Sequence, residues 1–412
     1  MFLTPAEAAT VRDQFGTPCY VYDHATLAAQ AQAALAFPHA FGFQLRYAMK
    51  ANPNHAVLKL FRNLGLHIDA SSDYEVERAL RAGFQPEEIQ LTSQMPSRLL
   101  GAHVERGVLY NACSLHQLAR FCEAFPRREV TIRVNPGLGS GSTNRTNTGG
   151  PGSSFGIWHE YLDEAKAIAA RHDVGIRGLH THIGSGSDPE VWQRVAGMSL
   201  AIAERLPDVT TVSLGGGFKV ARVAGEKSID LARVGATARA EFIAFKERTG
   251  RTLRLELEPG TYLVANAGIV VASVIAVVDT GAQGYVFAKL DTGMNEITRP
   301  SLYGAQHPIE VLAEGRPNAA VVFAGPCCES GDILTPAPGD AEALAPRDVP
   351  RPQVGDLVLV GGTGAYCAAM STSNYNSYPE APEVFRDGPG RFRLVRRRQT
   401  FDQVLANECD EA

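Results

Sequence analysis

Apolar and polar residues follow two different patterns along this chain. Between about residues 44 and 258, short apolar runs alternate with stretches whose apolar residues recur at helical spacing. The short runs predict eight strands, at residues 44–48, 67–69, 89–92, 108–111, 130–134, 176–182, 210–214 and 253–257. Amphipathic helices are predicted between them, among others at residues 73–84, 115–125, 161–172, 189–206 and 231–248. This α/β pattern has the strand count of a (β/α)8 barrel, and a doubly wound open sheet competes because periodicity does not show closure.

The pattern changes after about residue 265, where helical periodicity fades and Gly/Pro-rich turns separate short strands. Strands are predicted at residues 285–290, 319–324, 357–360 and 391–395, and the longest apolar run, 268–278, reads as a buried strand. These features predict a mostly antiparallel β domain, whose sheet the strand-like residues 19–22 could join. We therefore expect a barrel domain at residues 30–265 and a β-rich domain formed by residues 1–29 and 266–412.

Composition excludes several classes of function. The 412 residues are 45% hydrophobic and 20% charged, which is ordinary for a globular enzyme, and the net charge of -5 offers no basic field for nucleic acid. No Lys/Arg run indicates a membrane surface, and no apolar run is long enough to span a bilayer. The seven cysteines show neither a disulfide framework nor the paired spacing of a zinc site. With no signal peptide in the first residues, we expect a cytoplasmic protein without a metal.

Polar residues and glycines gather where the predicted barrel strands end. They are Lys50, Ser71, Asn111, Ser114, Asn135, His182, Ser185, the run Gly215, Gly216 and Gly217, and Glu258. In a barrel all of them would lie on the C-terminal face, where such folds build active sites. A Gly/Ser/Thr/Asn-rich stretch at residues 137–154 predicts a long loop on the same face, and long loops there are commonly functional.

Three of these features have a specific chemical interpretation. The run Gly215–Gly217 follows the seventh strand, where backbone N–H groups can approach phosphate oxygens, although a lone glycine triplet is more often a tight turn. Lys50 follows an apolar approach that would favour a neutral, nucleophilic amine, whereas most lysines extend along a surface. Glu258 could pair with a pyridinium nitrogen, or form an ordinary salt bridge or helix cap.

The remaining candidates are weaker when taken alone. His182 could stack on a cofactor ring, but a lone strand histidine is more often a satisfied core residue. Cys328 and Glu329, viewed singly, read as a buried thiol and a surface acid.

Taken together and in order, these residues resemble a known family. Along nearly its whole length the chain is similar to the diaminopimelate decarboxylase branch of the alanine-racemase-like, fold-type III pyridoxal-phosphate enzymes. The matching segments are 47–52 (YAMKAN), 147–150 (NTGG), 180–185 (HTHIGS), 214–217 (LGGG), 258–260 (EPG), 299–304 (RPSLYG), 328–332 (CESGD), 364–366 (GAY) and 374–376 (NYN).

The resemblance implies a role for each matched residue. Lys50 would hold pyridoxal 5'-phosphate as a Schiff base, His182 would stack on its ring, and Glu258 would pair with its pyridine nitrogen. The cofactor's phosphate would be bound by Ser185, Gly215, Gly216, Gly217 and Tyr366.

The resemblance also implies a homodimer with two shared active sites and a small amino-acid substrate. Cys328 and Glu329 would enter each site from the other subunit. Cys328 would donate a proton to the decarboxylated carbon, and Glu329, Arg299 and Tyr303 would contact the substrate side chain.

The chain departs from the family at several positions. The family usually has Arg after EPG, often Lys before residues 155–156, and commonly Arg after NYNS. This chain has Thr261, Ser154 and Tyr378 at those positions, and one extra residue between Met370 and Asn374. The first departure concerns substrate binding, because an arginine there would hold a distal carboxylate by a planar two-pronged contact.

Thr261 therefore leads us to predict decarboxylation of a basic or diamino acid of the D-lysine or D-ornithine kind. The alternative is a meso-diaminopimelate decarboxylase that makes L-lysine. An amino-acid racemase is disfavoured because racemases of this fold do not carry the pattern around Cys328. A catalytically dead homologue is disfavoured because Lys50, Glu258 and Cys328 are all present.

Overall fold

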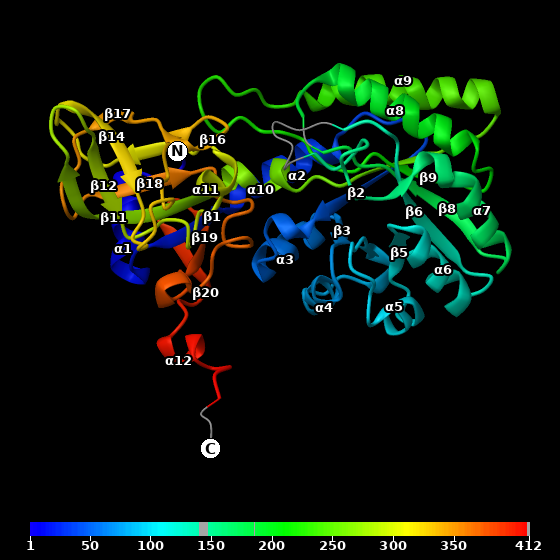
Figure 1. The fold of residues 1–412 in the computed structure, drawn as a ribbon, viewed down its shortest axis with the longest axis horizontal. Helices are drawn as coiled ribbons and strands as arrows, with labels where there is room; N and C mark the ends of the chain where they lie inside the picture. Colours follow the sequence, from blue (N-terminus) through cyan, green and yellow to red (C-terminus); the bar gives the residue numbers. More distant parts are fainter. Residues whose placement is uncertain (140–146, 185, 410–412) are drawn as a thin grey trace. The chain divides into compact units, whose positions relative to one another are not determined.

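The computed structural model describes residues 1–139, 147–184 and 186–409, which form two compact units (Figure 1). The first, which we call the barrel unit, comprises Ala28–Val220 and Lys227–Leu263. The second, the sheet unit, comprises Met1–Leu27, Ala221–Glu226 and Val264–Ala412. The short segment Ala221–Glu226 thus folds with the sheet unit, although residues of the barrel unit flank it in the sequence.

Eight parallel strands close into a ring in the barrel unit. They are β2 (Phe43–Ala48), β3 (His67–Ala70), β4 (Ile89–Leu91), β5 (Leu109–Ala112), β6 (Glu129–Asn135), β8 (Gly175–His180), β9 (Thr211–Ser213) and β10 (Arg254–Leu257). The ring closes because β10 pairs in parallel with β2, for example Leu255 with Phe43. The predicted (β/α)8 barrel is therefore confirmed, and the open sheet is excluded.

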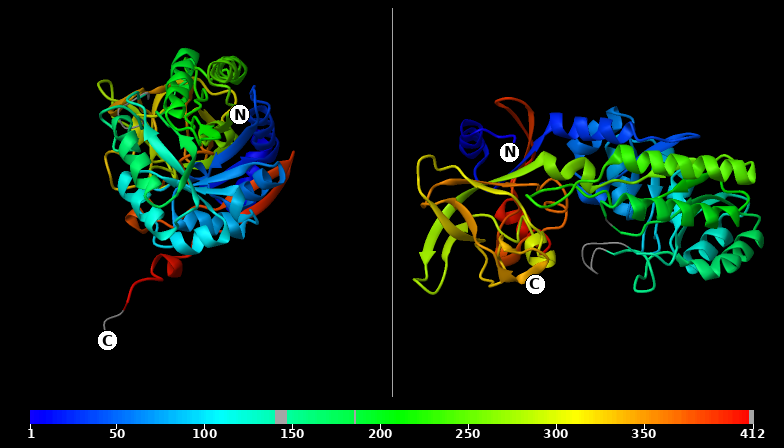
Figure 2. Two further views of the ribbon diagram at one scale, coloured as in Figure 1. Left: turned by 90° about the vertical axis from the view of Figure 1, so that its right-hand side faces the viewer. Right: turned by 90° about the horizontal axis from the view of Figure 1, so that it is seen from above.

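Helices cover the outside of the ring (Figures 1 and 2). They are α3 (His55–Asn63), α4 (Asp73–Arg81), α5 (Leu100–Arg106), α6 (Leu115–Ala124), α7 (Leu162–Ala170), α8 (Pro189–Glu204) and α9 (Leu231–Thr249), with α2 (His24–Leu35) leading into the barrel. Helix α4 shows why they form where they do. The side chain of Ser72 caps its first turn, which carries Asp73 and Glu75, and Arg78 and Arg81 lie in its last turn. The acidic residues in the first turn and the basic residues in the last turn both interact favourably with the helix dipole, and the serine cap satisfies a free backbone N–H group.

One strand end differs from the sequence prediction in a way that matters for the site. Strand β8 ends at His180, whereas the apolar pattern predicted a strand through residue 182. His182 consequently lies in the loop after the strand. A short strand that the pattern did not predict, β7 (Ile157–Trp158), pairs with the end of β6.

The sheet unit is built on a nine-stranded sheet. Its strands are β1 (Cys19–Asp23), β11 (Gly268–Asp279), β12 (Val286–Leu290), β13 (Ile309–Val311), β14 (Asn318–Ala324), β17 (Arg347–Pro350), β18 (Leu357–Gly361), β19 (Glu383–Gly388) and β20 (Arg391–Arg396). The apolar run at residues 268–278 forms the central strand β11, and β1 pairs beside it as expected. Most pairs are antiparallel, but β1–β19 and β12–β14 are parallel, so the sheet is mixed rather than purely antiparallel.

Short elements complete the sheet unit. They are α1 (Pro5–Phe15), α11 (Arg299–Tyr303), α12 (Phe401–Val404) and the hairpin of β15 (Pro336–Ala337) with β16 (Asp340–Leu344), whereas α10 (Thr261–Val264) begins in the barrel unit and ends with the first residue of this segment of the sheet unit. Helix α1 packs its buried Ala8 and Val11 against Val21, Ile269 and Leu359 of the sheet. None of the helices in the described residues is long and apolar enough to cross a membrane.

Candidate active site

Lys50 lies at the mouth of the barrel, in a single 3-10 turn (Met49–Ala51) directly after β2. Its neighbours Met49 and Ala51 are buried, but Lys50 itself is exposed. The chain alone therefore does not bury Lys50. The Lys50 charge instead acts on two nearby carboxylates, Asp69 and Glu75, and on His182. The amine is thus placed among the polar groups of the mouth.

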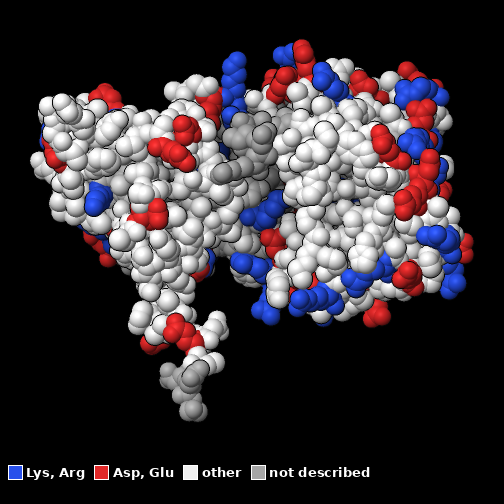
Figure 3. Space-filling view, viewed as in Figure 1, with Lys and Arg blue, Asp and Glu red and all other residues white. Residues whose placement is uncertain are grey.

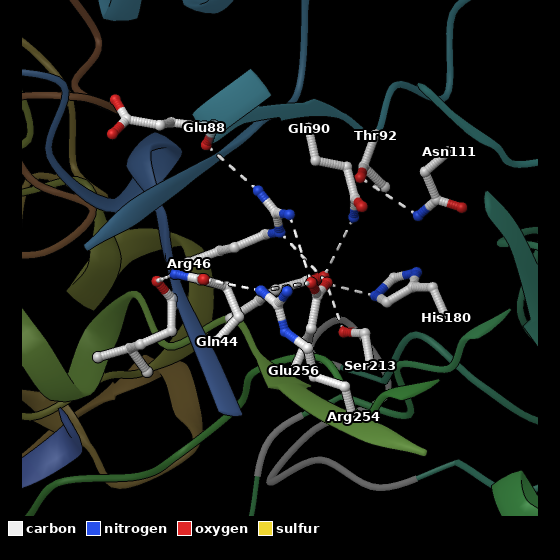
Figure 4. Close-up of polar contacts among 12 residues, drawn as sticks. Gln44, Arg46, Glu88, Gln90, Thr92, Asn111, His180, Ser213, Arg254 and Glu256 are labelled. Carbon is white, nitrogen blue, oxygen red and sulfur yellow. Dashed lines mark hydrogen bonds and ion pairs between the residues drawn. The ribbon is translucent and has the colours of Figure 1, made fainter. Parts of the chain in front are cut away.

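Glu258 follows β10 and is contacted by Gln90, His180 and Ser213, whose side chains converge inside the barrel (Figure 4). The side chain is only 5% exposed. The Ser213 hydroxyl donates to its Oε1 at 2.8 Å, Gln90 Nε2 lies 3.5 Å from the same oxygen, and His180 Nε2 lies 2.9 Å from Oε2. A carboxylate offers about four lone-pair sites, so three partners leave room for another donor.

The surroundings keep Glu258 ionised. Burial alone would raise the pKa of this carboxyl, but attraction to His180 and the hydrogen bonds from His180 and Ser213 lower it to about 2. An anion fixed in this way is what a protonated ring nitrogen needs as a partner.

Asp69 is a site residue that the sequence reasoning missed. It lies on β3, is 4% exposed, and has one carboxyl oxygen without a hydrogen-bond partner among the described residues. Burial, with repulsion from Glu258, raises its pKa to about 8. The signal was available, because a carboxylate at the end of a barrel strand occupies the same kind of position as Lys50 and Glu258.

We expect Asp69→Asn to stabilise the cofactor-free protein at pH 8. The raised pKa means that folded protein keeps a proton that unfolded protein has lost, so stability falls as pH rises from about 4 to 8. A neutral amide escapes this loss. Melting curves should show a gain of at least about 2 °C at pH 8 that shrinks toward pH 4. Asn in place of the exposed Asp208 serves as the control, and a gain independent of pH would contradict the assignment.

His182 and the glycine run pack directly against each other. The Gly216 N–H donates to His182 Nδ1 at 3.2 Å, which leaves the ring proton on Nε2. Desolvation, Arg133 and Lys50 hold the pKa of His182 well below its usual range, so the ring is neutral. Arg133, which the sequence reasoning also missed, lies on β6 with its guanidinium over the Phe155 ring.

The glycine run forms a turn that no larger residue could make. Gly215 and Gly217 have φ of +71° and +95°, in the left-handed region. A Cβ on Gly215 would lie 2.6 Å from His182 Nδ1, and one on Gly216 would lie 2.1 Å from the Glu258 carbonyl oxygen. Close packing against His182 and the Glu258 backbone therefore requires glycine at these positions, and the turn presents backbone without side chains.

Other residues predicted at the strand ends hold the scaffold. Ser114 caps α6, and Asn111 donates to the Thr92 hydroxyl. Asn135 anchors the loop after β6, since its side chain accepts from Gly137 and Gly150 and donates to the Gly150 carbonyl. Ser185, a predicted phosphate ligand, lies outside the described residues.

The predicted substrate-contacting residues are divided between the two units. Thr261 is the first residue of α10 in the barrel unit, and Arg299 and Tyr303 are the two ends of α11 in the sheet unit. Arg299 Nη1 donates to His307 Nε2 at 3.1 Å. Tyr366 also belongs to the sheet unit and has a left-handed backbone, with φ of 54°.

Cys328 and Glu329 lie in the sheet unit on the loop after β14, and both are exposed. The Cys328 N–H donates to Asn376 Oδ1 at 2.8 Å. The Glu329 carboxylate accepts from the Gly331 N–H within its own loop. The structure therefore presents this thiol and this carboxylate on the surface of their unit, held by the loop's backbone.

The residues at the barrel mouth fit pyridoxal phosphate. Lys50 supplies an accessible amine, Glu258 a buried anion for the ring nitrogen, and Gly215–Gly217 a backbone-lined turn for the phosphate. No group of three or more His, Cys, Asp or Glu side chains in the described residues has the arrangement of a metal site.

Comparisons with known proteins agree with this geometry. Residues 26–265 match the family model described as "Pyridoxal-dependent decarboxylase, pyridoxal binding domain". The chain is 42% identical to the diaminopimelate decarboxylase of Streptomyces coelicolor, covering 98% of this chain and 91% of that one. It is 37% identical to the diaminopimelate decarboxylase of Escherichia coli K12, covering 98% and 97%. A crystal structure of a diaminopimelate decarboxylase superimposes with a TM-score of 0.90 at 36% identity, over 97% and 95% of the two chains.

Proposed function

Since this chain belongs to the pyridoxal-dependent decarboxylases of fold type III, we propose that it decarboxylates the D-centre of meso-diaminopimelate and releases L-lysine. It is a carboxy-lyase that uses pyridoxal phosphate. The observation that carries the choice of substrate is the 42% identity with a diaminopimelate decarboxylase over 98% of the chain. The D-lysine or D-ornithine interpretation is matched only at the level of the decarboxylase family.

When bound, pyridoxal phosphate supplies the electron sink that accepts the electron pair left as carbon dioxide departs. Lys50 would hold the cofactor through its Nζ and exchange it for the substrate amine. Glu258, ionised as described above, would keep the proton on the ring nitrogen, and neutral His182 would pack against the ring.

Other residues would orient the reactants. The backbone of Gly215–Gly217, with Ser185 and Tyr366, would bind the phosphate. The Cys328 Sγ would deliver a proton to the carbon that lost its carboxylate. Arg299, Tyr303 and Glu329 would contact the far end of the substrate.

The distribution of these residues supports a homodimer with shared sites. Cys328 and Glu329 are exposed on their own unit, as residues that serve a partner's site must be. The barrel unit exposes Tyr74 (83%), Met95 (59%) and Leu99 (47%) in the segments after β3 and β4, on the face that carries Lys50. Grouped exposed apolar side chains commonly mark an interface between chains.

The surface charge supports a small substrate rather than a polyanion. On the described part of the face in Figure 3, Lys and Arg stand beside Asp and Glu over the barrel helices, and the formal net charge is -5. A nucleic-acid site would need basic residues gathered on one face.

Thr261 favours a second candidate substrate. Threonine is short and neutral, so it cannot replace the two-pronged contact of an arginine with a distal carboxylate. A D-configured basic amino acid such as D-lysine or D-ornithine lacks that carboxylate. D-lysine or D-ornithine is therefore the second candidate substrate.

Substrate preference decides between the two candidates. We expect kcat/KM for meso-diaminopimelate to exceed the values for D-lysine and D-ornithine by more than about tenfold. A panel of the three compounds with carbon dioxide detection measures this. If D-lysine or D-ornithine is preferred, the second candidate is correct. In that case Thr261→Arg should shift the ratio toward diaminopimelate, while Thr261→Ser should not.

A further inference from the structure

The segment Ala221–Glu226 brings an arginine into the sheet unit. The Asn266 amide donates to the Ala221 carbonyl at 3.1 Å, and the Arg222 N–H donates to the Glu226 carboxylate at 2.8 Å. These two bonds hold the backbone of Arg222. Its side chain then reaches the residue after β18, where Nε donates to the Gly362 carbonyl at 3.1 Å.

The Arg222 side chain lies in a place shaped by one glycine. A Cβ on Gly362 would lie 2.8 Å from Arg222 Cδ and 3.0 Å from its Cγ. Gly362 also has a φ of +66°, which L side chains rarely adopt. The backbone at Gly362 therefore fixes the direction of the Arg222 side chain, which is the preorganisation that a binding residue needs.

One nitrogen of the Arg222 guanidinium is left unpaired, although the Glu226 carboxylate acts on its charge. Its Nη2 is buried and has no hydrogen-bond partner within the described residues. Burial, and then repulsion by Arg299, lower its pKa to about 9. A buried, unpaired donor on a cation is costly, and an oxyanion is the ligand that would compensate it.

Arg299 is oriented by a neutral group and not by a carboxylate. His307 donates from Nδ1 to the Gly361 carbonyl at 2.8 Å, so its Nε2 accepts from Arg299. Burial and the two arginines hold the pKa of His307 well below its usual range. In the part of the chain that the structure describes, neither Arg222 nor Arg299 takes part in an ion pair with a carboxylate. Arg222 and Arg299 thus bind to groups at the adjacent residues Gly362 and Gly361, directly and through His307, and Arg222 Nη2 remains available to an anion.

We infer that Arg222 is a specificity-determining residue, which together with Arg299 binds the substrate carboxylate that is not removed. The inference rests on the proposed function, and it explains how a chain with Thr261 can still recognise diaminopimelate. The cofactor's phosphate is the other source of an oxyanion, because Tyr366, the predicted phosphate ligand, is also a neighbour of Arg222.

Equilibrium binding of two ligands measures how much the carboxylate contributes to affinity. L-lysine retains the carboxylate in question, whereas cadaverine is the same diamine without it. We expect calorimetric titration of the cofactor-loaded protein to show L-lysine bound more tightly than cadaverine by roughly ten- to a hundredfold. Arg222→Gln should reduce this ratio by about tenfold or more. Arg222→Lys keeps the positive charge but loses the planar pair of N–H donors, and it should give an intermediate ratio.

Two controls separate the alternatives. Arg351→Gln removes an exposed guanidinium of the same unit, paired with Asp279, and should leave the ratio as in the wild type. Titration of the cofactor-free Arg222→Gln protein with pyridoxal phosphate tests whether Arg222 binds the cofactor's phosphate instead of the substrate carboxylate. Melting curves establish that the variants fold. If Arg222→Gln does not fold, the ratio of the L-lysine and cadaverine affinities is measured with Arg222→Lys.

The outcomes are distinct. An unchanged ratio in Arg222→Gln would overturn the inference, as would weakened binding of pyridoxal phosphate with the ratio preserved. Equal wild-type affinities for L-lysine and cadaverine would also overturn it, even if diaminopimelate is decarboxylated. Conversely, a ratio that depends on Arg222 in a protein that does not decarboxylate diaminopimelate would sustain the inference and refute the proposed function.

Discussion

Lys50→Ala is expected to abolish decarboxylation, with a loss of at least about a thousandfold in kcat. Lys50 is the residue we propose to bond covalently to the cofactor, and it lies at the barrel mouth among Asp69, Glu75 and His182. Methyl in place of the aminobutyl chain leaves no amine to hold the cofactor or to exchange it for substrate. Initial rates of carbon dioxide release from purified protein measure the effect.

A second readout and a matched control accompany this measurement. Wild-type protein should be yellow and lose its visible band on borohydride reduction, whereas Lys50→Ala should not be labelled covalently. Lys59→Ala removes an exposed lysine from α3, in the same unit, and should keep wild-type rates. Near-normal decarboxylation by Lys50→Ala would refute the cofactor assignment.

The second large effect is the recovery of activity from two inactive proteins. If Lys50 and Cys328 of one active site come from different subunits, a heterodimer of Lys50→Ala and Cys328→Ala chains has one site with both residues intact. Random exchange makes half of the dimers heterodimers, so activity should rise from background to about a quarter of the wild-type value. Obligate interfaces are typically larger than about 2,000 Å², so exchange should be assisted by mild denaturant and verified by mass spectrometry.

The matched control for this experiment uses two residues of the same unit. Lys50 and Glu258 both belong to the barrel unit, so mixing Lys50→Ala with Glu258→Gln should leave no intact site in any dimer. Recovery in the first mixture alone would establish the shared site. Verified exchange without recovered activity would count against it, and recovery in both mixtures would show that mixing restores activity for another reason.

Much of the site was predictable because its signals are local. Lys50, the run Gly215–Gly217 and Glu258 follow directly after apolar strands, and the end of a strand can be read from a few neighbouring residues. Asp69 has the same local signal. Arg133 has no such signal, because a charged residue inside a strand pattern does not reveal which groups it will meet.

The error at the end of β8 has a similar origin. The residues after His180 continue the apolar and β-branched pattern, so the sequence predicted a longer strand. The pairing of β8 with β6 and β9 ends at His180, and this leaves His182 free to pack against Gly215 and Gly216. Pairing between strands, and not propensity along one strand, decided where the strand stops.

The order of the barrel elements and the β-rich character of the second unit could be read from the sequence, because both depend on residue type and spacing along the chain, and the cofactor followed from the resemblance of its motifs to a known family. The tertiary structure alone decided three other features. Closure depends on the pairing of β10 with β2, which are far apart in sequence. The ionisation of Glu258 depends on His180 and Ser213, which reach it from other strands. Arg222 donates to the Gly362 carbonyl and is repelled by the charge of Arg299 because its segment folds with the sheet unit. All three arise from contacts between distant segments, and no local pattern encodes which distant groups will share one low-dielectric space.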